Sequence, residues 1–159
     1  MSVAFTREAD AEAAAADLPD RPVSPHPNLV TESGLTAIER ELASARAART
    51  AAQTGGEVSA DRTAMARATR DLRYYAARRA SAQLVAFEPG LGRVRFGGSV
   101  TFERDDGRRQ TFRIVGEDEA DPARGSVSYV SPLARVLTGK RIGDTAILAG
   151  QEIEIVAVD

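Results

Sequence analysis

Apolar side chains recur every three or four residues along two stretches in the first half of the chain. The first series consists of Leu35, Ile38, Leu42, Ala45, Arg49 and Ala52, with one arginine among apolar residues. The second series consists of Met65, Ala68, Leu72, Tyr75, Arg79 and Ala82. This spacing is typical of helices that pack as a coiled coil. It predicts one helix from Thr31 and a second from about Ser59 to about Leu84.

A tight reversal of the chain is predicted between the two helices. Residues 53–56 read Gln-Thr-Gly-Gly, and paired glycines supply the left-handed backbone that ends a helix. Thr31 or Ser33 is expected to cap the first helix with its hydroxyl. At 1.5 Å per residue, helices of roughly 20 to 26 residues would be on the order of 30 to 40 Å long. Alanine and arginine at several contact positions predict weak packing between them.

The second half of the chain changes to short runs that are typical of β-strands. Strands are expected over residues 93–96, 99–104, 110–115, 126–130, 145–148 and 152–158. Asp105-Asp106-Gly107 is a strong hairpin turn. Ser131 followed by Pro132 predicts the cap and first turn of a short helix that stops at Gly139. The expected fold class is α+β, with an N-terminal antiparallel helical hairpin and a C-terminal antiparallel β domain containing one short helix.

Composition divides the chain into four segments. Residues 1–30 are expected to form an extended or disordered arm, because four prolines between Pro19 and Pro27 remove helix donors. Residues 31–86 hold the coiled-coil hairpin, residues 87–92 a linker rich in proline and glycine, and residues 93–159 the β domain. The arm is either a docking segment or a loose tail, and both interpretations stay open.

The composition excludes most enzyme classes. The chain has no cysteine and a single histidine, His26, so thiolate chemistry and Cys-based zinc sites are excluded and imidazole chemistry is scarcely available. We expect no cofactor and no metal site. No apolar run reaches the roughly 20 residues that cross a bilayer, and the first ten residues lack the apolar centre of a signal peptide. A cytoplasmic protein without membrane contact is therefore expected.

The net charge of −2 hides a basic middle segment. Residues 31–86 carry nine arginines against six acidic residues. This excess would suit a weak contact with RNA or DNA, or with an acidic protein surface, but it is also compatible with a solvated helix face. The charge pattern alone does not decide between them.

Four short motifs follow one another in the second half of the chain. They are 94–97 (VRFG), 114–121 (IVGEDEAD), 131–135 (SPLAR) and 143–144 (GD). In this order they resemble the carboxy-terminal domain of the GreA/GreB transcript cleavage factors. Residues 29–35, leading to Glu41-Leu42, also look like the amino-terminal part of that family. The resemblance covers roughly residues 29–159.

The resemblance implies an FKBP-like C-terminal domain that binds the rim of the secondary channel of bacterial RNA polymerase, while the hairpin points into the channel. It assigns the polymerase-binding surface to Asp118, Glu119, Asp121, Ser131, Pro132 and Arg135. Three carboxylates within four positions repel one another without a partner, which favours contact. The alternative is that these acids only solvate a turn.

The tip of the predicted hairpin departs from the family. Members that stimulate transcript cleavage carry Asp-x-x-Glu there, and the two carboxylates share a magnesium ion with the polymerase. Here the tip contains Gly55, Gly56, Glu57 and Asp61, with the acids four positions apart, and a helix dipole favours acids in a first turn without any metal. The stretch is also roughly ten residues shorter than in the family, which removes on the order of 10 to 15 Å of reach. This shortened hairpin resembles that of the regulator of nucleoside diphosphate kinase, a Gre relative.

These features favour a polymerase-binding regulator of the Gre type that is not an enzyme and does not stimulate cleavage. The alternative is a functional cleavage factor that uses Glu57 and Asp61. Prolyl isomerase activity is disfavoured, because fold does not fix function and no aromatic-lined pocket is evident. A further alternative is RNA binding by the arginines of the second helix, namely Arg62, Arg67, Arg70, Arg73, Arg78 and Arg79.

Overall fold

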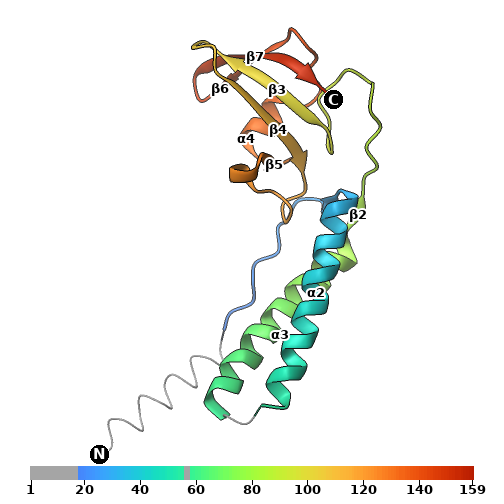
Figure 1. The fold of residues 1–159 in the computed structure, drawn as a ribbon, viewed down its shortest axis with the longest axis vertical. Helices are drawn as coiled ribbons and strands as arrows, with labels where there is room; N and C mark the ends of the chain where they lie inside the picture. Colours follow the sequence, from blue (N-terminus) through green and yellow to red (C-terminus); the bar gives the residue numbers. More distant parts are fainter. Residues whose placement is uncertain (1–17, 56–57) are drawn as a thin grey trace, which may run out of the picture. The chain divides into compact units, whose positions relative to one another are not determined.

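The computed structural model describes residues 18–55 and 58–159, with residues 58–61 as backbone only (Figure 1). These residues fall into two compact units, each built from two separate segments of the chain. The helical unit comprises residues 18–25 and 38–81, and the sheet unit comprises residues 26–37 and 82–159. The four segments expected from composition are not tested by this division and stay predictions.

The sheet unit is organised around five strands. They are β3 (Ser99–Arg104), β4 (Arg109–Val115), β5 (Ser126–Ser128), β6 (Thr145–Leu148) and β7 (Gln151–Val158). Their order across the sheet is β5-β4-β3-β7-β6. The sheet is antiparallel except for β5, which pairs in parallel with β4. The parallel pair is possible because residues 116–125, including a 3-10 turn at Pro122–Arg124, carry the chain back along the sheet.

The core of the sheet unit lies between one face of this sheet and the short helix α4 (Pro132–Leu137), as Figure 1 shows. Alternation along β3 and β7 turns every second side chain inward, so Phe102, Ile153 and Ile155 are fully buried. Helix α4 adds Ala134 and Leu137, which are also fully buried. The α4 face that bears these two residues is therefore fixed by packing.

Two local predictions in the sheet unit are confirmed. Residues 105–108 connect β3 and β4 as a hairpin, and Gly107 adopts a φ of 80° that favours glycine. The backbone N–H of Arg108 donates to the Asp106 carboxylate at 3.0 Å, which lowers the pKa of Asp106. The Ser131 hydroxyl accepts from the backbone N–H of Ala134 at 3.2 Å and caps α4.

Two element predictions are wrong, and long-range pairing explains both. Residues 93–96 form no strand, since the backbone of Val94 is bonded instead to Gly139 and Lys140 in the loop after α4. The second long helix ends at Ser81 and not near Leu84. Strand β2 (Gln83–Leu84) pairs in parallel with β1 (Leu29–Val30), and this pairing draws residues 83–84 out of the helical pattern.

The helical unit contains most of α2 (Glu32–Gln53) and all of α3 (Val58–Ser81), which run antiparallel in Figure 1. Glu39, early in α2, accepts from Arg79, late in α3, at 2.8 Å. Four small or apolar residues are buried here, namely Ile38, Leu42, Ala45 and Ala68. The α+β fold class with an N-terminal helical hairpin is therefore confirmed. No helix in the described part of the chain is long and apolar enough to cross a membrane.

Candidate protein-docking site

The acidic loop after β4 is a compact turn. The backbone N–H groups of Glu119 and Ala120 both donate to the carbonyl of Gly116, at 3.2 and 3.1 Å. Pro122 then begins the 3-10 turn, and its fixed φ reduces the number of backbone conformations available to the loop. The three acids predicted to bind a partner are thus held on an ordered backbone.

Glu119 points back into the sheet unit. Its carboxylate accepts hydrogen bonds from the hydroxyls of Thr31 at 2.5 Å and Ser33 at 2.6 Å, and it lies 3.6 Å from the Arg113 guanidinium. Only 17% of its side chain is exposed. Thr31 is also the N-cap of α2, because its hydroxyl accepts from the backbone N–H of Gly34 at 3.0 Å. Glu119 therefore fastens the first turn of α2 to the loop after β4.

Two glycines make this close approach possible. A side chain at Gly116 would place its Cβ 2.3 Å from the backbone oxygen of Leu29. A Cβ at Gly34 would lie 2.6 Å from the Glu119 carboxylate. Close packing of the segment that leads into α2 therefore explains why the 114–121 motif has a glycine, Gly116, at this position.

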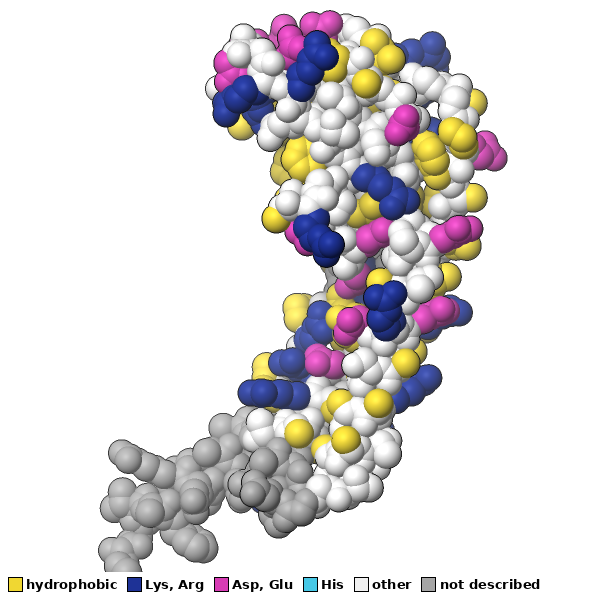
Figure 2. Space-filling view, viewed as in Figure 1, with side chains coloured by type: hydrophobic (Ala, Val, Ile, Leu, Met, Phe, Trp, Pro, Cys, Tyr) yellow, Lys and Arg dark blue, Asp and Glu magenta, His cyan; other side chains and the backbone are white. Residues whose placement is uncertain are grey.

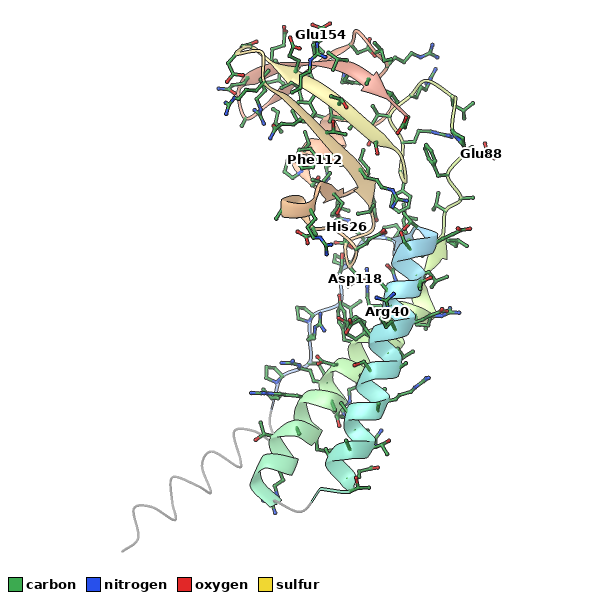
Figure 3. The ribbon with its side chains drawn as sticks, in the orientation of Figure 1. His26, Arg40, Glu88, Phe112, Asp118 and Glu154 are labelled. Carbon is green, nitrogen blue, oxygen red and sulfur yellow. The ribbon has the colours of Figure 1, made fainter. Side chains whose placement is uncertain are left out.

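Asp118 and Asp121 flank Glu119 and are more accessible. Asp118 is exposed on the loop, where Figure 3 labels it, and Asp121 is half-buried. The backbone N–H of Asp121 donates to the Ser126 hydroxyl at 2.9 Å, which positions the residue at the start of β5. The loop therefore directs one carboxylate inward and leaves the two beside it nearer to solvent.

Ser131, Pro132 and Arg135 lie at the start of α4. Pro132 and Arg135 are exposed, because the opposite side of the helix is occupied by the buried Ala134 and Leu137. Ser131 is half-buried and is engaged in capping. The packed helix thus holds an exposed proline and an exposed arginine in fixed positions.

Strand β5 joins the acidic loop to α4. The Ser126 N–H donates to the carbonyl of Asp121 at 3.1 Å, and the Ser131 N–H donates to the carbonyl of Ser128 at 2.9 Å. Since β5 has three residues and strands rise about 3.3 Å per residue, its two ends are separated by roughly 7 Å. β5 is also one of the two edge strands of the sheet, the other being β6. The predicted residues are therefore brought to one sheet edge, and their role in binding stays a prediction.

A polar groove of about 370 Å³ lies on this edge. Its lining includes Arg113, Glu119, Asp121, Arg124 and Ser126. Two arginines and two acids face the same space, so the groove presents charges of both signs. Such a surface suits polar recognition of a protein partner better than it suits a polyanion.

The predicted hairpin tip lies largely outside the described residues. Gly55 is the last residue described before the gap, and Gly56 and Glu57 fall within it. Asp61 belongs to α3, but its side chain is also outside the described part. Among the described residues, no group of three or more His, Asp or Glu side chains is arranged to hold a metal ion.

The arginines of the hairpin are interspersed with acids. Arg70 contacts Asp71 at 3.2 Å and Arg73 contacts Asp20 at 3.2 Å. On the face seen in Figure 2, basic and acidic side chains alternate and do not gather in one basic patch. This mixing weakens the electrostatic attraction for nucleic acid that the arginine count alone would predict.

Sequence reasoning missed the contacts that secure the segment before α2. Besides Thr31 and Ser33, the Tyr129 hydroxyl donates to the carbonyl of Pro27 at 2.5 Å. These contacts join residues that are 86 to 102 positions apart in the sequence, a separation that local periodicity cannot report. Gly116 was the available signal, since a glycine between a strand and an acidic turn indicates a close backbone approach.

Comparison with known proteins gives consistent matches. A protein-family model described as "Transcription elongation factor, GreA/GreB, C-term" matches residues 88–159. The transcription elongation factor GreB of Pasteurella multocida is 34% identical over 132 residues, which cover 74% of this chain and 84% of that protein. GreB of Neisseria meningitidis serogroup B is 49% identical over 70 residues, 42% of this chain and 43% of that protein. The chain thus matches less than half the length of the Neisseria protein.

Two solved structures are similar at lower identity. GreA factor homolog 1 (Gfh1) of Thermus thermophilus is 22% identical with a TM-score of 0.39, covering 84% of this chain and 99% of that one. A GreA/GreB factor of Nitrosomonas europaea is 18% identical with a TM-score of 0.39, covering 84% and 98%. At these scores the structures add no detail to the site described above.

Proposed function

Because the chain belongs to the GreA/GreB family of transcription elongation factors, we propose that it binds bacterial RNA polymerase in the cytoplasm, at the rim of the secondary channel, as a regulator and not as an enzyme. The proposed contact is the β5 edge of the sheet unit. The observation that carries it is the exposed pair Pro132 and Arg135 on a helix fixed by its buried face, beside the ordered loop of Asp118 and Asp121. Prearranged groups of this kind lose little freedom on binding.

We further propose that the protein does not stimulate transcript cleavage. Helices α2 and α3 have 22 and 24 residues, so at 1.5 Å per residue each is about 33 to 36 Å long. Glu57 and Asp61 lie four positions apart in the sequence, in place of the family's Asp-x-x-Glu. A metal–oxygen bond tolerates only tenths of an ångström, so a short hairpin with different acid spacing is poorly suited to share a metal.

The docking surface can be tested by measuring binding to core RNA polymerase. We expect Asp121→Arg and Pro132→Glu each to weaken binding about tenfold or more, because they reverse a charge or add one at the proposed contact. Glu152→Arg is a matched control, since Glu152 is exposed on β7, which β4 and β3 separate from β5 in the sheet. Unchanged binding by both site variants would show that another face is used.

The second candidate, a cleavage factor that uses Glu57 and Asp61, is favoured by the presence of two acids beside the predicted turn. The test is RNA length in stalled polymerase complexes with magnesium and the purified protein. We expect no shortening beyond the polymerase alone. Shortening that Glu57→Ala or Asp61→Ala abolishes would establish the second candidate and refute the first.

A weak contact between the arginines of α3 and RNA or DNA completes the proposal. Pairing of Arg70 and Arg73 with acids supports a weak contact only. Free RNA should therefore bind with low affinity and with a shallow dependence on salt, because few phosphates would be neutralised. Tight binding with a steep salt slope would instead make RNA a principal partner.

A further inference from the structure

The two edges of the sheet differ in how their backbone groups are used. At the β5 edge, the Ser126 N–H donates to the carbonyl of Asp121 at 3.1 Å. The Ser131 N–H donates to the carbonyl of Ser128 at 2.9 Å. Turns on both sides of β5 therefore occupy backbone groups that a further strand would need. Among the described residues, no turn makes such bonds to β6, which forms the opposite edge.

The register between β6 and β7 determines which backbone groups of β6 face outward. Residues 149–150 join the two strands with φ values of 49° and 78°, as in a two-residue hairpin, so Leu148 and Gln151 form the closing bonded pair. Bonded pairs then alternate with non-bonded pairs along the ladder. The Ile155 N–H donates to the carbonyl of Asp144 at 2.9 Å, as this alternation requires.

The outward groups of β6 belong to Thr145 and Ile147. Both residues lie in non-bonded pairs with β7, so their N–H and C=O groups point away from it. No backbone bond joins these groups to another residue in the part of the chain that the structure describes. Both residues are exposed, and the strand contains no proline and no charged residue that would protect it. β6 is therefore open to a further strand.

Charge indicates which strand would fit. Lys140 and Arg141 precede β6, whereas Glu152 lies in β7 opposite Ile147, near the other end of β6. Arg141 and Glu152 are exposed, and neither is in an ion pair with another described residue. An antiparallel partner places the start of one strand beside the end of the other. A second β6 would thus bring the basic end of each copy towards the acidic end of the other.

We propose that β6 pairs antiparallel with β6 of a second copy of this chain, around a two-fold axis at Ala146. Thr145 of each copy then faces Ile147 of the other, and each facing pair exchanges two backbone hydrogen bonds. The two Ile147 side chains, each 59% exposed in one copy, become diagonal neighbours on the solvent-exposed face of the joined sheet. The pairing therefore uses both the open backbone groups and the exposed apolar side chain.

The dimer is expected to be weak and reversible. β6 has four residues, so the contact would bury less than the roughly 1,200 Å² of a stable interface. Repulsion is small, because Glu154 of one copy and Glu152 of the other would lie about three strand spacings apart, roughly 14 Å, beyond a Debye length of about 8 Å. The β5 edge takes no part, so this association is independent of the proposed polymerase contact.

Sedimentation of the full-length protein from about 5 to 500 µM tests the association. We expect the average mass to rise towards that of two chains. Ile147→Glu should weaken association about tenfold or more, because it places a charge on each side of the axis beside Glu152. Leu91→Glu is the matched control, since Leu91 is 58% exposed in the loop before β3. A monomer at every concentration, or equal weakening by both variants, would overturn the proposal.

Disulfide trapping tests the register, since the chain has no native cysteine. Chains carrying Thr145→Cys are mixed with chains carrying Ile147→Cys under mild oxidation. Facing residues have Cα atoms about 5.5 Å apart, within the range of a disulfide. We expect disulfides between the two variants to form about tenfold faster than disulfides within either one, because only the mixed pair faces across the axis. Equal rates, or faster pairing of identical variants, would overturn the antiparallel arrangement.

Discussion

The sheet unit and the helical unit are stabilised in different ways. In the sheet unit the fully buried side chains are large, among them Phe102, Ile114, Leu137, Ile153 and Ile155. In the helical unit the buried apolar side chains are smaller in volume, with two alanines beside Ile38 and Leu42, and the large side chain buried in this unit is that of the charged Arg78. Polar contacts such as Glu39 with Arg79 and Arg21 with Asp71 supplement it. The sheet unit is therefore stabilised mainly by burial of large apolar side chains, whereas the helical unit depends on many small packing and polar contributions.

The match to the family model lies on one side of this division. The family model matches residues 88–159, which all lie in the sheet unit. A surface of fixed shape needs a well-packed core beneath it, and large apolar side chains provide one. A helical pair is more tolerant of changes in length and tip chemistry, since each turn contributes a similar small amount. The part of the chain that the family model matches is thus also the part with the large buried side chains.

The largest expected effect is loss of a core aromatic ring. Phe102→Ala should destabilise the sheet unit by about 4 kcal/mol, because it leaves a cavity between β3 and α4. Leu42→Ala should cost about 2 kcal/mol in the helical unit, since the loosely packed site can collapse around the smaller side chain. Residue-resolved hydrogen exchange of each variant measures the stability of both units in the same sample. Equal losses in the two units would contradict the difference in packing.

The second-largest expected effect concerns Gly116, the glycine that packs against the segment leading into α2. Gly116→Ala should cost about 3 kcal/mol, because the new Cβ meets backbone that cannot rotate away. Gly34→Ala is the matched control, since its Cβ would meet the Glu119 carboxylate, a side chain that can move. Urea unfolding should show the smaller loss for Gly34→Ala. The reverse order would show that the segment before α2 is more adaptable than its contacts indicate.

The third effect tests Glu119 as a fastening residue. Glu119→Ala should destabilise the sheet unit by about 2 kcal/mol, because the buried Thr31 hydroxyl loses an acceptor and the exposed Ser33 and Arg113 each lose a partner. Glu119→Gln keeps one acceptor oxygen and should recover part of the loss. Exchange protection of the first turn of α2 is the readout. If Glu119→Ala instead weakened polymerase binding with no change in this protection, Glu119 would be a contact residue as the family resemblance implied.

Much of the fold could be predicted because it depends on patterns among residues that are close in the sequence. The strands at 99–104 and 145–148, the Asp106-Gly107 turn and the Ser131 cap depend on neighbouring residues, and each is found where the sequence places it. Gln83 and Leu84 continue the helical pattern and yet form a strand, because Leu29 and Val30 offer backbone partners. Tertiary pairing overrides local propensity at such positions.

The candidate site was predicted as a set of residues but not as a structure. The acid-rich motif indicates a functional loop, yet nothing in its composition distinguishes Glu119 from Asp118. The distinction arises from Thr31 and Ser33, more than 80 positions earlier, whose hydroxyls select one of the three carboxylates. Identifying such a partner from one sequence would require knowing the fold first.

The smallest expected effect addresses the contacts of the helical unit. Arg21→Ala should cost about 1 kcal/mol, because it removes a partly exposed cation over the Tyr74 ring and one ion pair with Asp71. Arg21→Lys should retain part of this, since lysine keeps the charge but not the planar stacking. Arg46→Ala on the exposed face of α2 is the control and should be neutral. Thermal unfolding at low and high salt separates the contributions, because salt screens the ion pair more than the ring contact. A loss well above this size would mean that the arm, and not the alanine contacts between α2 and α3, chiefly stabilises the helical unit.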